Sequence, residues 1–186
     1  MPVDAPDAAR LAAGRFQLRP FAEGDLALYA ALFTDVDVMR EVGTPFTPER
    51  AARAAAASLA HQRHARGRFR HWVVEHADST AGLLGLALRG PRWPGGEAEL
   101  GVLLWPAWQA RGAATAALRA IRPWAFATAG MARLTCHHRE GHERAARLMR
   151  GVGFSRAPAR ADSPLPVGWE LSATALDAER KPRSLG

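Results

Sequence analysis

The chain has 186 residues, of which 48% are hydrophobic, with 25 lysine and arginine residues against 18 aspartate and glutamate residues. This length predicts one domain with a core of its own. No run approaches the roughly 18 consecutive apolar residues of a membrane-spanning helix, so we expect no membrane partner. The N-terminal residues lack the basic and then apolar pattern of a secretory signal, and the single cysteine, Cys136, excludes an internal disulfide. Both features lead us to expect a cytoplasmic protein.

The charge balance is strongly basic, with a formal net charge of +7 and a sequence pI near 11.2. Lys181 is the only lysine and asparagine is absent, a composition typical of a GC-rich coding sequence, so codon usage explains part of the arginine excess. The densest basic stretch, residues 61–71, is typical of a solvated helix end and loop, with an acidic or RNA partner as the alternative. We therefore do not expect a nucleic-acid partner.

Hydrophobic periodicity and turn residues predict the elements in chain order. A flexible lead over residues 1–14 precedes a domain over residues 15–176, and a flexible tail covers residues 177–186. Strands are expected over residues 16–21, 71–76, 83–89, 99–104, 132–137, from 154 onward and over 167–172. Helices are expected after Asp25, from Thr47 to about residue 65, from Gly112 to a stop at Gly130, and over residues 143–152. The order predicts an α/β (α+β) single domain, a mixed central sheet of about six to seven strands flanked by about four helices.

Two of the helix starts carry a capping signal. The carboxylate of Asp25 can accept a hydrogen bond from a free N–H group of the first helical turn. Thr47 is followed by Pro48, and a capping threonine before a proline at the first helical position is a stronger signal for a helix start.

The segment from Glu97 to Phe126 carries the clearest chemical signal in the chain. Its apolar run from Glu99 to Leu104 predicts a strand that ends at Pro106, because proline has no N–H group for the ladder. A helix then begins at a glycine followed by two alanines. Their small side chains leave the first backbone N–H groups open, and the helix dipole favours negative charge there. The segment therefore predicts a cradle for a phosphate-bearing cofactor.

The sequence motifs in and around this cradle resemble those of a known family. Gln109-Ala-Arg-Gly-Ala-Ala114 is similar to the acetyl-CoA signature of the GNAT N-acetyltransferases. The flanking words AELGVLL and ATAALRAI are most similar to the branch that acetylates the N-terminal amines of ribosomal proteins. The resemblance covers roughly residues 15–175 and implies the GNAT fold, with acetyl-CoA as the acetyl donor and coenzyme A as the product.

The resemblance also implies which residues hold acetyl-CoA. The pantetheine arm would pair with the backbone of the strand residues Val102, Leu103 and Leu104. The pyrophosphate would bind the turn and helix start, formed by Gln109, Ala110, Arg111, Gly112, Ala113, Ala114 and Thr115. The family usually has an asparagine where this chain has His142, and we expect the histidine to keep one hydrogen bond to the cofactor.

The chemistry is the attack of an uncharged amine on a thioester, which requires a base. Glu99 is the first candidate, because it stands at the head of the cofactor strand like the glutamate of the ribosomal branch. His137 is the second, since an imidazole titrates near neutral pH and its position resembles one where some N-terminal acetyltransferases carry their base. His138 should point to the opposite face of its strand.

Other candidates for chemistry are weaker. Many family members use a tyrosine to protonate the thiolate where this chain has Met149, so we expect the thiolate to take its proton from water. Cys136 is typical of a buried small hydrophobe and not of a nucleophile. The histidines near it lack the spacing of paired metal ligands, so we expect no metal.

The acceptor side is the part that the sequence describes least. The family fold implies that aromatic residues line it: Tyr29, Phe33, Phe46 and Trp169. These residues suit a protein N-terminal amine, which is our first expectation, or a small-molecule amine such as an amino acid, a polyamine or an antibiotic. A non-catalytic acetyl-CoA-binding module is a further alternative. The sequence leaves a monomer or a homodimer equally open.

Overall fold

The structure, a computed structural model, describes residues 7–64, 67–89 and 95–174. Residues 1–6 of the expected lead, part of the turn around Pro91 and the expected tail lie outside the described residues. Within the described part, no helix is long and apolar enough to cross a membrane.

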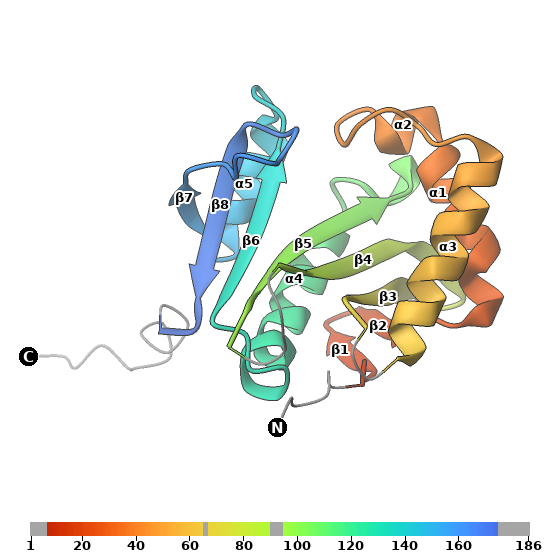
Figure 1. The fold of residues 1–186 in the computed structure, drawn as a ribbon, viewed down its shortest axis with the longest axis horizontal. Helices are drawn as coiled ribbons and strands as arrows, with labels where there is room; N and C mark the ends of the chain where they lie inside the picture. Colours follow the sequence, from red (N-terminus) through yellow and green to blue (C-terminus); the bar gives the residue numbers. More distant parts are fainter. Residues whose placement is uncertain (1–6, 65–66, 90–94, 175–186) are drawn as a thin grey trace, which may run out of the picture.

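A single eight-stranded sheet organises the described residues (Figure 1). Its strands lie in the order β1-β2-β3-β4-β5-β6-β8-β7, and every neighbouring pair is antiparallel except β5 and β6. In chain order the strands are β1 Leu11–Ala13, β2 Phe16–Pro20, β3 Phe69–His76, β4 Ser79–Arg89, β5 Glu97–Leu104, β6 Arg133–His138, β7 Ser155–Ala157 and β8 Val167–Ser172.

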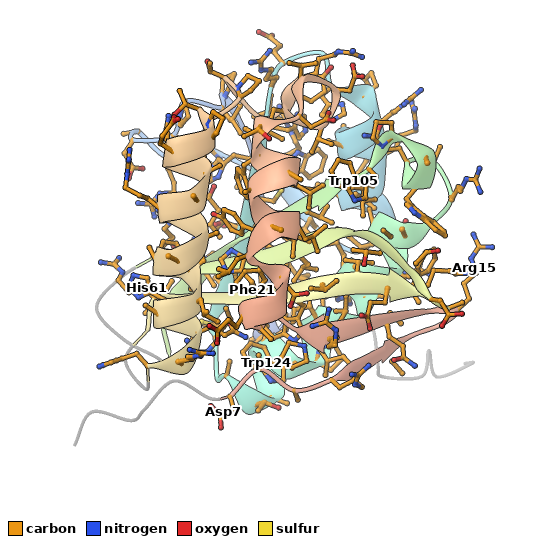
Figure 2. All side chains as sticks on the ribbon, turned by 90° about the vertical axis from the view of Figure 1, so that its right-hand side faces the viewer. Asp7, Arg15, Phe21, His61, Trp105 and Trp124 are labelled. Carbon is orange, nitrogen blue, oxygen red and sulfur yellow. The ribbon has the colours of Figure 1, made fainter. Side chains whose placement is uncertain are left out.

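Helices cover both faces of this sheet, as Figures 1 and 2 show. Their bounds are α1 Leu26–Thr34, α2 Val36–Met39, α3 Pro48–Arg63, α4 Ala113–Pro123 and α5 Glu143–Gly151. A buried cluster that includes Leu32, Leu59 and Val73 joins α1 and α3 to one face. A larger cluster that includes Leu86, Leu118 and Ile121 joins α4 to the other face. The layers confirm the predicted single-domain α+β fold with a mixed sheet.

The structure corrects the prediction at the N-terminal end. Leu11–Ala13 form strand β1 and pair with β2, although their sequence predicts a flexible lead. The strand is three residues long and polar residues surround it, so its pattern is too short to detect without the partner strand. The short helix α2 is a second addition to the predicted elements.

The two predicted helix starts have different outcomes. Thr47 caps α3 as predicted, with its side-chain oxygen accepting the Arg50 N–H at 3.3 Å and Pro48 at the first helical position. Helix α1 begins after Asp25, but the Asp25 carboxylate does not cap it. That carboxylate accepts hydrogen bonds from the Ala22 N–H at 2.8 Å and from both terminal nitrogens of Arg19. A charged guanidinium is the stronger partner for a carboxylate, so tertiary pairing displaces the local cap.

Strands β5 and β6 separate part-way along their length, and this separation positions the functional site (Figure 1). Their parallel ladder pairs Glu97 with Arg133, Ala98 with Leu134 and Glu99 with Thr135, and then it ends. Beyond that point the β5 backbone from Gly101 to Leu104 pairs with β4 alone. Because each strand offers hydrogen-bonding groups at both edges, β5 has a free edge that faces the gap.

Candidate active site

A cavity of about 1540 Å³ opens at the separation of β5 and β6. It extends from the start of α4 and the first turns of α5, past β5, to the face of the sheet under α1 and α3. Single-ligand pockets measure roughly 300–1,000 Å³, so this cleft has room for two ligands side by side. We call the α4 end the cofactor end and the α1–α3 end the acceptor chamber.

The start of α4 has the geometry of an anion cradle. Gly112, the residue before the helix, is left-handed with φ +83°, and no side chain caps the first turn. Ala110 is also left-handed, with φ +57°. A backbone that alternates in this way turns successive N–H groups toward one point, and the first N–H groups of a helix lack partners within it. The predicted residues Ala113, Ala114 and Thr115 line the cleft at this point.

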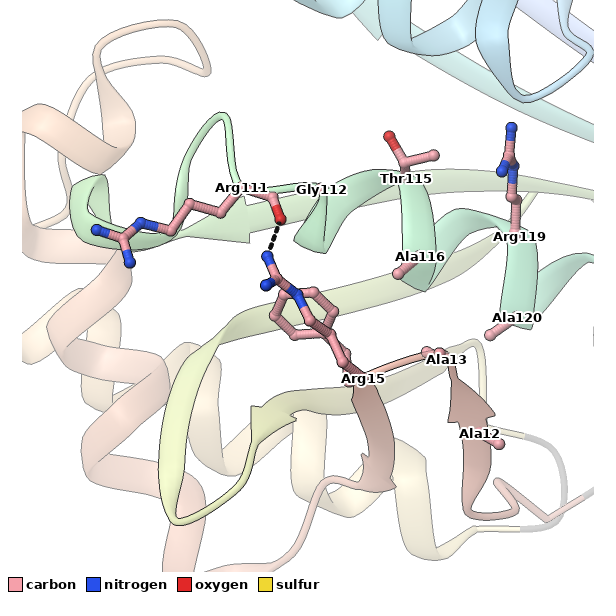
Figure 3. A pocket seen from close by; sticks show the side chains of 11 residues that line it. Ala12, Ala13, Arg15, Arg111, Gly112, Thr115, Ala116, Arg119 and Ala120 are labelled. Atoms are coloured by element: carbon pink, nitrogen blue, oxygen red, sulfur yellow. Dashed lines mark hydrogen bonds between the residues drawn. The ribbon is translucent and has the colours of Figure 1, made fainter.

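Two hydrogen bonds hold the turn before α4. Gln109 donates its side-chain amide to the Leu104 carbonyl oxygen at 3.2 Å, which ties the turn to the end of β5. On the other side Arg15 donates to the Arg111 carbonyl oxygen at 2.7 Å (Figure 3). The second bond spans a shallower hollow of about 570 Å³ between the β1–β2 turn and α4. Both bonds occupy carbonyl groups and leave N–H groups free, as an anion cradle requires.

The residues predicted to contact the pantetheine arm line the cleft. Val102, Leu103 and Leu104 line the cleft on the free edge of β5. Across the gap, His142 lines the cleft just before α5, with its ring 5.8 Å from that of His138 in an edge-on arrangement. Burial lowers the pKa of His142, so this ring is neutral at neutral pH and can donate or accept one hydrogen bond.

Glu99 and His137 lie together where the two strands part. The Glu99 carboxylate is paired with the Arg89 guanidinium, with the Arg89 Nε at 2.7 Å. Its other oxygen lies 3.5 Å from the His137 Nδ1. The second ring nitrogen of His137 faces the Arg160 N–H at 3.4 Å and serves as its acceptor. The Nδ1 atom is buried and near the Glu99 carboxylate, but it makes no hydrogen bond with it among the described residues.

His138 and Trp169 occupy the opposite face of their strands. The Trp169 indole N–H donates to the His138 Nε2 at 2.8 Å in the protein interior. Trp169 is 2% exposed and does not line the cleft, so its predicted place on the acceptor side is wrong. The reason is register, because Trp169 pairs with Cys136, whose side chain points away from the Glu99 face. Because side chains alternate between the two faces of a strand, the Trp169 side chain lies in the core under α5.

Cys136 and Met149 line the cleft without chemistry of their own. Burial raises the pKa of the Cys136 thiol to about 12, with the nearby Glu99 charge as a smaller cause. A thiol that stays protonated is a poor nucleophile. Met149 is 3% exposed and supplies only apolar surface. Among the described residues, no group of three or more His, Cys, Asp and Glu side chains is placed to hold a metal ion.

The other three predicted acceptor residues form one aromatic wall. Tyr29 stacks on Phe33 with ring centroids 4.4 Å apart, and Phe33 stacks on Phe46 at 5.1 Å. All three line the acceptor chamber. Burial raises the pKa of the Tyr29 hydroxyl, and a hydrogen bond with Ser58 offsets part of that effect. The wall is continued by Arg50, whose guanidinium lies 3.9 Å from the centre of the Phe46 ring.

Several chamber residues are not predicted from the sequence, because they belong to the basic stretch 61–71. His61, Phe69 and His71 all line the chamber, although that stretch is predicted to be a solvated helix end. Arg70, 1% exposed, donates to the carbonyl oxygens of His61 at 2.8 Å and Phe69 at 2.9 Å. The buried guanidinium thus fixes the C-terminal end of α3 over the chamber. The alternation His71-Trp72-Val73 predicts a strand, but only the pairing of this strand in the sheet shows which of its two faces lies toward the chamber.

The comparisons with known proteins agree with this geometry. The sequence model of the acetyltransferase (GNAT) domain matches residues 15–155. The chain belongs to the GNAT acetyltransferases. No functionally curated protein matches the chain. The predicted superfamily is therefore confirmed, while the ribosomal branch stays a prediction.

Solved structures show the same GNAT fold at low sequence identity. An acetyltransferase from Agrobacterium tumefaciens has a TM-score of 0.72 at 24% identity, over 89% of this chain and 95% of that one. A spermidine N-acetyltransferase from Vibrio cholerae, solved with CoA and spermine, has a TM-score of 0.73 at 17% identity, over 87% and 97%. The aminoglycoside acetyltransferase AAC(6')-Ib, solved with coenzyme A, has a TM-score of 0.74 at 15% identity, over 89% and 99%.

Proposed function

We propose that this GNAT acetyltransferase transfers the acetyl group of acetyl-CoA to a primary amine held beside Glu99, and that the amine is the N-terminal amine of a protein. The observation that carries the proposal is the position of Glu99. Its carboxylate lies where β5 leaves β6, between the anion cradle of α4 and the acceptor chamber. One negatively charged group thus stands at the boundary between the two ligand spaces.

The cradle fits the phosphates of acetyl-CoA, which supplies a thioester when bound. Small residues surround a left-handed Gly112, and no side chain competes for the first N–H groups of α4. Helix N-termini of this kind bind phosphate through backbone donors and the helix dipole. The free edge of β5 supplies backbone donors and acceptors for an extended amide-bearing arm.

Glu99 has two tasks in this reaction. Its carboxylate attracts the acceptor as an ammonium ion, and then takes the proton that the amine must lose before it attacks, directly or through one water molecule. Arg89 holds one carboxylate oxygen by hydrogen bonds, and the other oxygen lies 3.5 Å from the His137 Nδ1. Because Cys136 stays protonated, the attack comes from the amine itself and needs no covalent enzyme intermediate.

The charges of the chamber favour an acceptor with a single positive charge. Asp37 is paired with Arg40 and Glu99 with Arg89, so the arginines offset these two carboxylates. Arg50 adds a cation and Glu41 adds a carboxylate to the lining, so the chamber has no excess of negative charge. A polyamine or an aminoglycoside carries several ammonium groups, which a lining without excess negative charge does not neutralise. The first residue of a peptide carries one ammonium group and an apolar or polar side chain, and this combination suits the aromatic wall.

The test is thiol release from acetyl-CoA with N-terminal peptides, aminoglycosides and polyamines, using the wild type and Glu99→Gln. We expect turnover on peptides and a loss of roughly 10²–10⁴-fold in kcat in the variant, the contribution typical of a positioned base. Acetyl-CoA affinity, measured by calorimetry, should stay within about twofold, since Glu99 lies outside the phosphate cradle. Turnover only on a small amine would reject the protein acceptor and keep the reaction. Full activity of Glu99→Gln would reject Glu99 as the base.

A further inference from the structure

The floor of the acceptor chamber contains a row without side chains. On the face of the sheet under α1 and α3, Gly101 of β5 lies directly opposite Gly85 of β4. Gly85 in turn lies directly opposite His71 of β3. Both glycines and His71 line the cleft. The His71 ring reaches back over Gly85, so the open part of the row is a trough about one strand spacing (about 5 Å) long, from Gly101 to the edge of that imidazole.

The neighbouring rows give this trough its walls. Val73, Leu83 and Leu103 lie opposite one another on one side, and their side chains join the cluster under α1 and α3. Phe69, Ala87 and Glu99 form the row on the other side. Glu99 is therefore beside the open end of the trough at Gly101, about 7 Å away along the same strand and on the same face.

The space above Gly101 is open, whereas the space above Gly85 is next to the His71 ring. A Cβ atom added at Gly101 would meet no other atom within 4 Å, so the space over this residue is open. A Cβ atom at Gly85 would lie 3.0 Å from the Nε2 and Cδ2 atoms of His71. The His71 ring therefore packs directly over Gly85, and a side chain at this position would displace the ring.

The far end of the trough is aromatic and uncharged. The His71 ring lies 5.8 Å from that of Tyr29 and 6.2 Å from that of Phe69. Burial lowers the pKa of His71 to about 4, with the nearby His61 as a second cause, so the ring is neutral at neutral pH. Its Nδ1 is buried without a hydrogen-bond partner among the described residues. This end offers apolar contact and one neutral hydrogen-bonding group.

We propose that the trough is the side-chain pocket of the acceptor, and that it selects amines with a large apolar or aromatic group next to the amine-bearing carbon. The inference rests on the proposed function, which places the amine at Glu99. The side chain then runs over Gly101 toward the His71 ring. A peptide that begins with Phe, Met or Leu has this chemistry. A peptide that begins with Ala or Ser leaves the trough empty.

The test compares glycine variants against this series of peptides. Gly101→Ala places a methyl group at the mouth of the trough, in open space. It should raise KM for peptides that begin with Phe or Met about tenfold or more, as a steric change of one carbon does in an apolar pocket. KM for the Ala peptide and the affinity for acetyl-CoA should change less than about twofold. Gly24→Ala is the matched control, since its Cβ also meets no other atom and Gly24 lies outside the cleft.

Gly85→Ala pushes the His71 ring, which closes the far end of the trough. It should impair the Phe peptide about tenfold and spare a peptide that begins with Val, whose side chain is too short to reach the ring. Wild-type preference for Ala or Ser peptides over Phe and Met peptides would overturn the proposal, as would Gly101→Ala that behaves like Gly24→Ala. The melting temperatures of all variants are measured alongside, so a folding defect is not read as lost selectivity.

A binding experiment separates failure of this proposal from failure of the proposed function. Phenethylamine, a primary amine with an aromatic group, is titrated calorimetrically into the protein loaded with coenzyme A. Binding that Gly101→Ala weakens about tenfold or more supports the pocket even where no peptide is acetylated. Absence of binding, or binding that is equal in both proteins, overturns it.

Discussion

The cofactor end and the acceptor chamber are built in different ways, although they share one cleft. The cofactor end consists mainly of backbone: the left-handed turn at Gly112, the first N–H groups of α4 and the free edge of β5. The acceptor chamber consists of side chains from α1, α3 and three strands, with the aromatic wall on one side and the glycine trough below.

This difference explains why one end is suited to a constant ligand and the other to a selective one. Backbone donors depend on local geometry, which many side chains permit, so acetyl-CoA can be bound with few sequence demands. Selectivity for an amine depends on the shape that several distant side chains form together. Substitutions should therefore affect the acceptor chamber and the cofactor end separately, and the following experiments test that separation.

The largest expected effect concerns the pH dependence of stability at the chamber. The pKa of His71 is lowered to about 4 in the folded protein, from an ordinary value near 6.5. The unfolded chain therefore binds more protons than the folded one between these values, and stability falls as pH falls from 6.5 to 4. The contribution of this histidine is up to about 3 kcal/mol.

The measurement is urea unfolding of the wild type and His71→Leu at pH 7 and pH 4. The wild type should lose up to about 3 kcal/mol more than the variant over this interval, because leucine cannot be protonated. The difference between the two proteins cancels the other titrating groups, His61 included. Equal losses in both would show that His71 is solvated and that the chamber end is open to water.

The sequence predicts these two regions to different extents. The cofactor end is predictable because its determinants are consecutive, a glycine and small residues directly after a proline-terminated strand. The chamber floor depends on the pairing of Gly101 with Gly85 and of Gly85 with His71, across three strands. No local pattern specifies this register, and each glycine alone is an unremarkable strand residue.

The same reasoning accounts for the errors at Trp169 and in the basic stretch. Trp169 is assigned to the acceptor side by resemblance, but its pairing with Cys136 turns it toward the core. Arg70 belongs to a basic stretch, yet its guanidinium is buried by the carbonyl oxygens at the end of α3. In both cases a residue distant in the sequence determines whether the side chain is buried, and the local sequence pattern does not identify that residue.

The second prediction concerns the turn of the cofactor end. Gly112→Ala adds a methyl group that meets no atom within 4 Å, so its cost is conformational, from φ +83°. A non-glycine residue in this region costs about 1–2 kcal/mol, and we expect acetyl-CoA to bind roughly tenfold more weakly in calorimetry. Acceptor KM at saturating acetyl-CoA should stay unchanged.

A matched control for this prediction is Gly95→Ala. Gly95 has φ +81°, its added Cβ also meets no atom, and it lies outside the cleft. Gly95→Ala should carry a similar stability cost and keep its affinity for acetyl-CoA. Equal weakening of the cofactor in both variants would mean that general destabilisation, and not the shape of the turn, sets the affinity.

The smallest effect is expected where the two regions meet. Cys136 lines the cleft, and a nucleophilic thiol there would allow a covalent acetyl-enzyme route in place of direct transfer to the amine. Because burial holds the pKa of this thiol at about 12, we expect Cys136→Ala to keep kcat within about twofold.

The native thiol should react with iodoacetamide much more slowly than the same thiol in the urea-unfolded chain. A variant without activity that still binds acetyl-CoA, or fast alkylation that acetyl-CoA blocks, would assign the thiol a part in the chemistry. Such a result would reject direct transfer as the mechanism, but it would not affect the proposals for the anion cradle and the trough.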